Sequence, residues 1–181
     1  IRFKHLLPTC GVFDEDRVFD RGPGPGPIAF KGIKLGVMIC EDMWNGDVTE
    51  CLDESGAEIL IVLNGSPFEV DKTDQRLNLA VARVSESGLP LVYVNLVGGQ
   101  DELVFDGGSF VLGADRQLPI QLPGFAKGQV TSNWSKSDQG WVCAPGEIAE
   151  TPDDNEKMLA SIYQAMVLGL RDYVNKNRFP G

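Results

Sequence analysis

The segment IKLGVMICEDMW, residues 33–44, decides the fold of this chain. Residues 33–39 are an apolar run of strand length, and the polar turn 41–46 follows at once and leads into a helical pattern. A strand that turns sharply into a helix is an arrangement that exposes nucleophiles in α/β enzymes. Cys40 occupies this elbow, so we predict that it is a candidate nucleophile. The alternative is an inert buried thiol, the commonest state of a cysteine.

Working outward from this elbow, apolar runs of strand length alternate with helical periodicity. The pattern predicts a helix over 47–55 closed by Gly56, a strand over 57–63, a helix over 74–87 stopped by Gly88 and Pro90, and a strand over 91–96. The second half of the strand at 57–63 is entirely apolar, so we expect both of its faces to be covered. Strands alternating with helices predict a layered α/β sheet.

The flanking regions have weaker patterns. Residues 1–32 are expected to be loop-rich, with a stiff extended connection at the Gly-Pro stretch 22–27. Residues 108–122 predict a hairpin and therefore an antiparallel edge of the sheet. Residues 131–150 are polar and are expected to form a connection without a core of its own.

A long amphipathic helix is predicted from Thr151 to Asn177. Thr151 is a suitable N-cap, Pro152 suits the first helical position, and acidic residues follow at positions 153, 154 and 156. Its apolar positions recur at helical spacing: Leu159, Ile162, Tyr163, Met166, Val167, Leu170, Tyr173 and Val174. Core packing and docking on another domain would both explain this apolar face.

Composition limits the classes of function. The chain has 181 residues, with 16 Lys and Arg against 26 Asp and Glu, and 43% of its residues are hydrophobic, which suits one domain with an ordinary core. No basic residues cluster, so nucleic acid and anionic membrane surfaces are excluded as expected partners. The longest apolar run, 59–63, is far shorter than the roughly 20 residues of a membrane span.

The cysteine pattern bears on metal binding and on compartment. Four cysteines lie far apart, and the chain has a single histidine, so we expect no metal site. Scattered single thiols are typical of a reduced, cytoplasmic protein. Cys10, Cys51 and Cys143 lack the elbow context of Cys40 and are expected to be structural or incidental.

Lys4 is the candidate for a cation that would favour the thiolate form of Cys40. Lys4 lies in the apolar stretch 3–8, where a lysine can be held close to a thiol and favour the thiolate. The alternative for Lys4 is a surface lysine whose aliphatic stem is covered. The adjacent His5 would be needed for a Cys–His arrangement, but a structural role is the stronger expectation for it.

Several segments together resemble a known family. KHLLP (4–8) and GVMICEDMW (36–44) resemble the lysine and cysteine segments of the nitrilase, or carbon–nitrogen hydrolase, superfamily. More narrowly, three segments resemble the glutaminase domain of glutamine-dependent NAD synthetases: GVFDE (11–15), LNGSPF (63–68) and VNLVGGQDELVFDGGS (94–109). The closing helix with NRFPG (177–181) resembles the joint that leads into the ATP-using synthetase domain. The resemblance covers most of the chain.

The resemblance implies an α/β fold, a partial nitrilase-type α-β-β-α sandwich with a C-terminal linker helix. Residues 1–130 would be part of the glutaminase domain, and residues 131–181 a connection and helix leading to an ATP-dependent synthetase domain. We therefore expect the chain to be a fragment with no cofactor of its own, while ATP, Mg and deamido-NAD would bind the synthetase domain. The implied partners are glutamine, that synthetase domain and further copies in a homo-oligomer.

The resemblance also implies roles for residues. Cys40 would attack the side-chain carboxamide of glutamine and form a γ-glutamyl thioester, with release of ammonia. Lys4 and the backbone N–H of Glu41 would stabilise the oxyanion. The general base of the family, a Glu, would lie upstream of Ile1. The glutamine pocket would include Phe13, Glu41, Trp44 and Ser66, and Glu15 would be an auxiliary acid or, alternatively, a solvated loop carboxylate.

Two alternatives to this function stay open. One is a free-standing aliphatic amidase or nitrilase, and the other is a non-catalytic nitrilase-like assembly module. Because the expected general base lies upstream, the 181-residue chain by itself is expected to be inactive.

Overall fold

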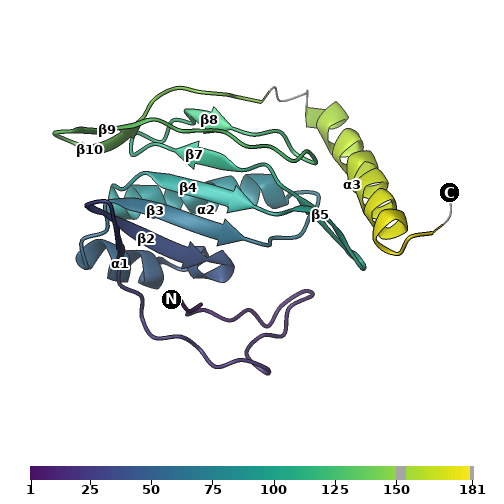
Figure 1. Cartoon of the computed structure of the whole chain (residues 1–181), viewed down its shortest axis with the longest axis horizontal. Helices are drawn as coiled ribbons and strands as arrows, with labels where there is room; N and C mark the ends of the chain where they lie inside the picture. Colours follow the sequence, from purple (N-terminus) through teal and green to yellow (C-terminus); the bar gives the residue numbers. More distant parts are fainter. Residues whose placement is uncertain (150–153, 180–181) are drawn as a thin grey trace.

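The fold is a six-stranded mixed sheet with helices on one face. The computed structural model describes residues 1–149 and 154–179, and for residues 154–157 the backbone alone. Within these residues the sheet has the order β1-β2-β3-β4-β7-β8 (Figure 1). Its strands are β1 (Ile28–Phe30), β2 (Ile33–Ile39), β3 (Ile59–Asn64), β4 (Leu91–Asn95), β7 (Phe110–Leu112) and β8 (Ile120–Gln121).

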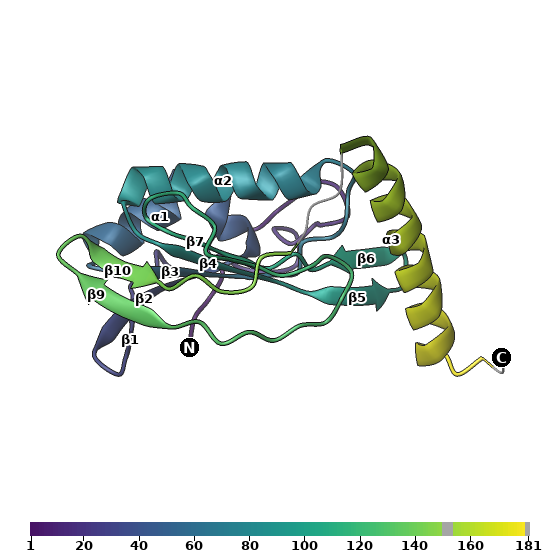
Figure 2. The ribbon, with the colours of Figure 1, turned by 90° about the horizontal axis from the view of Figure 1, so that it is seen from above.

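The centre of the sheet is the predicted alternation of strands and helices. Strands β2, β3 and β4 are parallel, and they are connected by α1 (Gly46–Glu54) and α2 (Lys72–Ser87). Both helices lie on the same side of the sheet (Figure 2). Each is followed by a left-handed glycine, Gly56 (φ +83°) and Gly88 (φ +68°), so both predicted stops are confirmed.

The main core lies between the sheet and these helices. It is made of fully buried apolar side chains, which include Met38, Met43, Leu52, Leu60, Val62, Val84, Leu91 and Tyr93. Gly36 in β2 makes room for its neighbours, because a Cβ there would meet Leu60 Cδ2 of β3 at 2.9 Å and Ala57 Cβ at 3.1 Å. The strand that leads to the elbow is therefore closely packed.

The opposite face of the sheet is only partly covered. Cys143 packs with Val111 and Ile120 on this side, but Leu63, Val94 and Leu96 are each about half exposed. The expectation that both faces of the strand at 57–63 are covered is therefore wrong at Leu63. The described chain has one α–β half of the predicted sandwich, and the apolar face where a second sheet would pack is open.

Three strand pairings were not predicted. β1 lies in the region 1–32 that was expected to be loop, and it pairs antiparallel with β2. A ribbon forms from β5 (Val97–Gln100) and β6 (Leu103–Asp106), and a hairpin forms from β9 (Trp134–Ser137) and β10 (Gly140–Cys143). These strands have at most four residues and little apolar alternation, so backbone pairing defines them and periodicity does not.

The β9–β10 hairpin replaces the expected plain connection at 131–150. Glu58, just before β3, accepts hydrogen bonds from Lys136 Nζ (2.5 Å) and Trp141 Nε1 (3.3 Å) of this hairpin. These bonds, with one from the Lys34 backbone, lower the pKa of Glu58 to about 2. The predicted hairpin at 108–122 is confirmed as β7 and β8 at the sheet edge.

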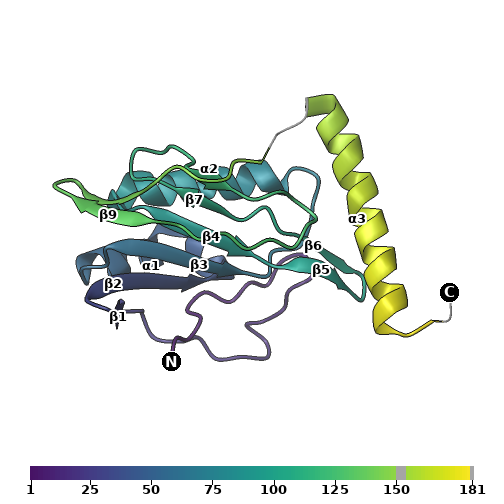
Figure 3. The ribbon, with the colours of Figure 1, turned by 45° about the horizontal axis from the view of Figure 1, so that its top comes forward.

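The C-terminal helix, α3 (Asp154–Lys176), forms as predicted and stands at the end of the sheet against the β5–β6 ribbon (Figure 3). Ala165 and Leu168 are buried, Gly99 N donates to Asp172 Oδ2 (2.8 Å), and Lys176 Nζ donates to Gly99 O (2.5 Å). The N-cap at Thr151, Pro152 and the acid at 153 lie outside the described residues, as do the side chains of 154 and 156.

The predicted apolar stripe of α3 is largely exposed. Leu159, Tyr163, Met166 and Leu170 are each about two-thirds exposed, so core packing within the described residues does not explain them. None of the described helices, α3 included, combines the length and apolar character that a bilayer crossing requires.

Two leucines of β3 test this assignment of faces. Leu60→Ala should lower the free energy of unfolding by about 2–5 kcal/mol, because it leaves a cavity in the core. Leu63→Ala, the same change on the opposite face of the same strand, should cost less than about 1 kcal/mol. Urea unfolding followed by circular dichroism measures both, and equal losses would contradict the assignment.

Candidate active site

Cys40 lies at the carboxyl end of β2, where the chain turns sharply. It has a positive φ of 50° and is the first residue of a short 3₁₀ helix, η1 (Cys40–Met43). A left-handed conformation is uncommon for a residue other than glycine, and it persists only where the surrounding structure imposes it. The predicted strand-to-helix elbow is therefore confirmed as a strained turn in a packed setting.

Asp42 connects the elbow to the N-terminal segment. Its side chain is fully buried, and Oδ1 accepts hydrogen bonds from the backbone N–H groups of His5 (2.9 Å) and Leu6 (2.8 Å). Oδ2 accepts from Ile39 N and from Arg2 Nη2, both at 3.0 Å. One carboxylate thus joins residues 2–6 to the end of β2 and fixes Lys4 beside the elbow.

Lys4 is held in an ion pair rather than extending into solvent. Its Nζ donates to Glu15 Oε2 at 2.5 Å, and the two side chains are 15% and 24% exposed. Glu15 is itself positioned by its backbone N–H, which donates to Pro8 O (2.9 Å). Glu15 is therefore not a freely solvated loop carboxylate. His5 Nδ1 is 2.7 Å from Gly22 O, which gives this histidine a structural contact.

The electrostatic balance at Cys40 favours the thiol. Burial is the largest influence and raises the pKa of Cys40 above its ordinary value. Lys4 and a backbone hydrogen bond from Gly65 act in the opposite direction, whereas the charges of Glu41 and Glu15 raise the pKa further. The described residues therefore do not by themselves produce a thiolate at neutral pH.

A second cation lies near the elbow and was not predicted from the sequence. Lys72, the first residue of α2, places Nζ 5.3 Å from the ring centroid of Trp44 and 2.6 Å from Glu69 Oε1. Burial raises the pKa of Glu41, while the charges of Lys4 and Lys72 lower it. The elbow thus has a carboxylate and an ammonium group close enough to influence each other.

Two further predicted pocket residues, Phe13 and Ser66, come from different loops. Phe13 is half-buried in the loop that also carries Glu15, after the left-handed Gly11. Ser66 is buried in the turn after β3, and its Oγ accepts a hydrogen bond from Arg76 Nε (3.1 Å). The roles of both in binding substrate stay predictions.

The other three thiols are not part of the site formed by Cys40, Lys4 and Glu15. Cys10 is exposed, Cys51 Sγ contacts Pro25 O (3.4 Å), and Cys143 is buried in the second core cluster. In the part of the chain that the structure describes, no three His, Cys, Asp or Glu side chains gather in a group suited to a metal ion.

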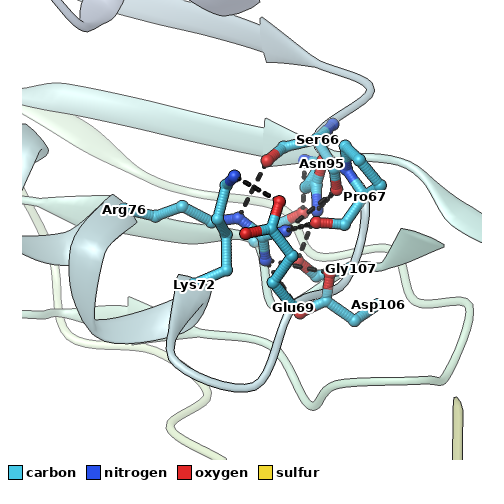
Figure 4. Close-up of polar contacts among 9 residues, drawn as sticks. Ser66, Pro67, Glu69, Lys72, Arg76, Asn95, Asp106 and Gly107 are labelled. Carbon is cyan, nitrogen blue, oxygen red and sulfur yellow. Dashed lines mark hydrogen bonds and ion pairs between the residues drawn. The ribbon is translucent and has the colours of Figure 1, made fainter. Parts of the chain in front are cut away.

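A buried polar network beside the elbow also escaped sequence analysis. Arg76 Nη1 donates to both carboxylate oxygens of Asp106, at 2.9 and 2.8 Å (Figure 4). Its Nη2 donates to the carbonyl oxygens of Ser66 (2.9 Å) and Pro67 (2.8 Å), and Asn95 Oδ1 accepts from Ser66 N (3.0 Å). The periodicity of α2 gives no sign that Arg76 is buried. Asn95 and Asp106, in contrast, lie in the segment 94–109 that carries the family resemblance, and this was the available signal.

The fold and site together define a class of protein. A thiol at a strained elbow, a lysine fixed beside it and a carboxylate on that lysine stand at the carboxyl end of a parallel strand, the edge where α/β sheets place their ligands. Comparison with known proteins agrees with this class: the family model Carbon-nitrogen hydrolase matches residues 2–135. The chain belongs to the carbon–nitrogen hydrolase family.

Relatives narrow the family. The chain is 46% identical over 176 residues to the glutamine-dependent NAD(+) synthetase of Rhodobacter capsulatus, which covers 97% of this chain and 31% of the relative. The match to the enzyme of the same name from Acinetobacter baylyi is 36% identical and covers 98% of this chain and 32% of the relative. The chain thus spans about a third of the length of these relatives.

Solved structures show the same relationship. The glutamine-dependent NAD+ synthetase of Acinetobacter baumannii, in complex with ADP, has a TM-score of 0.87 at 37% identity and covers 98% of this chain and 33% of its own. A carbon–nitrogen hydrolase from Helicobacter pylori G27 has a TM-score of 0.58 at 29% identity, over 66% of this chain and 47% of that one. An amidase from Nesterenkonia sp. AN1, seen after Michael addition of acrylamide at its active-site cysteine, has a TM-score of 0.55 at 27% identity, over 67% and 46%.

The electrostatics of Cys40 can be tested directly. Lys4→Met removes a charge that favours the thiolate, so the pKa of Cys40 should rise further. Alkylation by iodoacetamide, followed peptide by peptide with mass spectrometry, should therefore need a higher pH at Cys40 and be unchanged at the exposed Cys10. Lys136→Met, a lysine paired with Glu58 on the surface, is the matched control. A profile that stays in place or moves to lower pH in Lys4→Met would contradict the assignment.

Proposed function

We propose that this chain is the glutamine-hydrolysing part of a glutamine-dependent NAD synthetase, with Cys40 as its nucleophile. The observation that carries the proposal is the position of Cys40, at a left-handed elbow with Lys4 and Glu15 fixed beside it. The relatives that cover 97–98% of the chain support the substrate, since they are glutamine-dependent NAD(+) synthetases.

The proposed reaction is acyl transfer through a thioester. A bond forms between Cys40 Sγ and the side-chain carbonyl carbon of glutamine, the C–N bond breaks, and ammonia leaves. The thiol proton passes to a general base, which the resemblance places upstream of Lys4, and then to the departing nitrogen. Water cleaves the thioester to give glutamate. Because burial raises the pKa of Cys40, a base has to take the thiol proton for the sulfur to attack.

Lys4 and the elbow backbone would stabilise the developing charge. Among the charges that act on Cys40, that of Lys4 has the largest effect, and it favours the thiolate. The N–H of Glu41, the residue after the nucleophile, supplies a second donor to the oxyanion. Losing one such donor typically costs about 3 kcal/mol of transition-state stabilisation.

The charges around the elbow suit a zwitterionic amino acid. We assign the Glu41 carboxylate to the ammonium group of glutamine and the Lys72 ammonium to its carboxylate, since the charge of Lys72 acts on Glu41. Trp44, which lies under Lys72, would form an apolar wall of the pocket together with Phe13. Glu15 would act as the auxiliary acid through Lys4, and Ser66 would border the pocket from the turn after β3.

The ammonia would serve a synthetase that converts deamido-NAD to NAD. In this proposal residues 1–130 belong to the hydrolase part, and residues 131–181 lead to the domain that binds ATP, Mg and deamido-NAD. The Acinetobacter baumannii relative was solved with ADP, which supports a nucleotide site in the longer protein. The proposal includes a cytoplasmic homo-oligomer.

An amidase acting on simple aliphatic amides is the second candidate. The likeness to the Nesterenkonia amidase favours it, but that match covers 67% of this chain, whereas the NAD synthetase match covers 98%. The positive φ of Cys40 favours a catalytic role over a non-catalytic assembly module, because strained residues cluster at active sites.

The decisive variant is Cys40→Ala in the full-length gene product. It should abolish release of ammonia and glutamate from glutamine, because no sulfur remains to form the thioester, and should keep NAD synthesis when ammonia is supplied directly. Cys51→Ala, a half-buried thiol outside the site, is the matched control and should keep glutamine turnover. Undiminished glutamine hydrolysis in Cys40→Ala would refute the nucleophile, and faster turnover of acetamide or butyramide than of glutamine would favour the amidase.

A further inference from the structure

Arg76 is a buried arginine with no donor left for a ligand. Nε donates to Ser66 Oγ, Nη1 donates to both oxygens of Asp106, and Nη2 donates to the carbonyl oxygens of Ser66 and Pro67. A guanidinium group has five N–H donors, and all five are used within the protein. Arg76 therefore acts on the site through the groups that it holds, and not by touching substrate.

The groups that Arg76 holds belong to the turn that follows β3. β2 and β3 are parallel neighbours with Ile39 opposite Leu63, and β3 ends at Asn64, so residues 65–67 leave the sheet beside Cys40. The backbone of Gly65 in this turn favours the anionic form of Cys40. A shift of this turn would therefore change the surroundings of the thiol directly.

Asn95 holds the same turn from the neighbouring strand. Its Oδ1 accepts from Ser66 N (3.0 Å), and its Nδ2 donates to Ser66 O (3.3 Å) and Gly107 O (3.1 Å). Figure 4 shows Asn95 and Arg76 converging on Ser66 from β4 and α2. Arg76 also binds the Ser66 hydroxyl and the Pro67 carbonyl, which Asn95 does not contact, so the two side chains together support the turn.

Asp106 orients Arg76 from the end of β6. The side chains of the pair are 4% and 8% exposed, so two charges are removed from water. Such pairs contribute little net stability compared with apolar residues of similar size, because their desolvation offsets their attraction. Their value lies in fixing one conformation, and the planar guanidinium is suited to holding a carboxylate and two carbonyl groups together.

We propose that Arg76, oriented by Asp106, is a positioning residue that fixes the turn at residues 65–67 and thereby keeps the Gly65 backbone beside Cys40. Its effect on turnover rests on the proposed function, whereas its effect on the thiol does not. The Gly65 backbone favours the thiolate as the thiol proton leaves, and the fixed turn keeps the sulfur aligned with the carbonyl carbon.

The test is the double variant Arg76→Met/Asp106→Leu in the full-length gene product. It removes both charges together, so no buried charge is left unpaired and the protein should keep its fold. Alkylation of Cys40 by iodoacetamide should need a higher pH than in the wild type. With glutamine, kcat should fall by about 10²-fold while KM changes little, which is the usual effect of misplacing a reacting group by about 1 Å.

Two further variants separate positioning from general stability. Arg76→Lys keeps a cation for Asp106 but cannot supply five donors, so its alkylation profile should lie between those of the wild type and the double variant. If the double variant does not fold, Arg76→Lys is used for the test in its place. Ile120→Ala, which removes buried volume from the cluster of Val111, Ile120 and Cys143 on the other face of the sheet, should lower stability and leave the alkylation profile in place.

The outcomes distinguish this inference from the proposed function. If the folded double variant, or Arg76→Lys in its place, has the wild-type alkylation profile, the positioning role is refuted. If the profile moves to higher pH, the positioning role is supported even where the wild type does not hydrolyse glutamine, which would refute the proposed function alone. An equal displacement of the profile in Ile120→Ala would also overturn the inference, because the effect would then follow from stability.

Discussion

The site depends on the buried carboxylate of Asp42. Two residues after the candidate nucleophile, it binds the backbone N–H groups of His5 and Leu6, the N–H of Ile39 and the guanidinium of Arg2. Several hydrogen bonds from distant parts of the chain offset the free-energy cost of removing this carboxylate from water. The bonds to His5 and Leu6 join the N-terminal segment to the end of β2 and fix Lys4 near Cys40, and the Leu6 side chain adds apolar packing against the core.

The same burial that organises the site opposes ionisation of its thiol. Desolvation raises the pKa of Cys40, and Lys4 and the Gly65 backbone only partly offset this. The positive charge of Lys4 is in turn shared with Glu15 at 2.5 Å. A thiol whose pKa is raised reacts more slowly at neutral pH unless a base takes its proton, because the thiolate is the reactive form.

Sequence reasoning succeeded where the signal is local. The β2 run followed by a polar turn predicted the elbow at Cys40, and glycines at 56 and 88 marked the ends of both core helices. It failed where pairing or burial comes from distant residues: β1, β5–β6 and β9–β10 are too short for periodicity to indicate them. In α3 the helix was predicted correctly, but Ala165 and Leu168 are its buried apolar residues, Gly169 approaches Gly99, and most of the predicted apolar stripe is exposed.

By itself the sequence determined the parallel α/β order, the elbow, the residue types at the site and, through its motifs, the family. Only the tertiary structure decided that Glu15 pairs with Lys4, that Lys72 lies over Trp44, and that Arg76 and Asp106 support the turn beside the thiol. The physical reason is the range of each interaction. Periodicity and capping act within a few residues, whereas a buried charge is tolerated only when partners brought from elsewhere in the chain satisfy it.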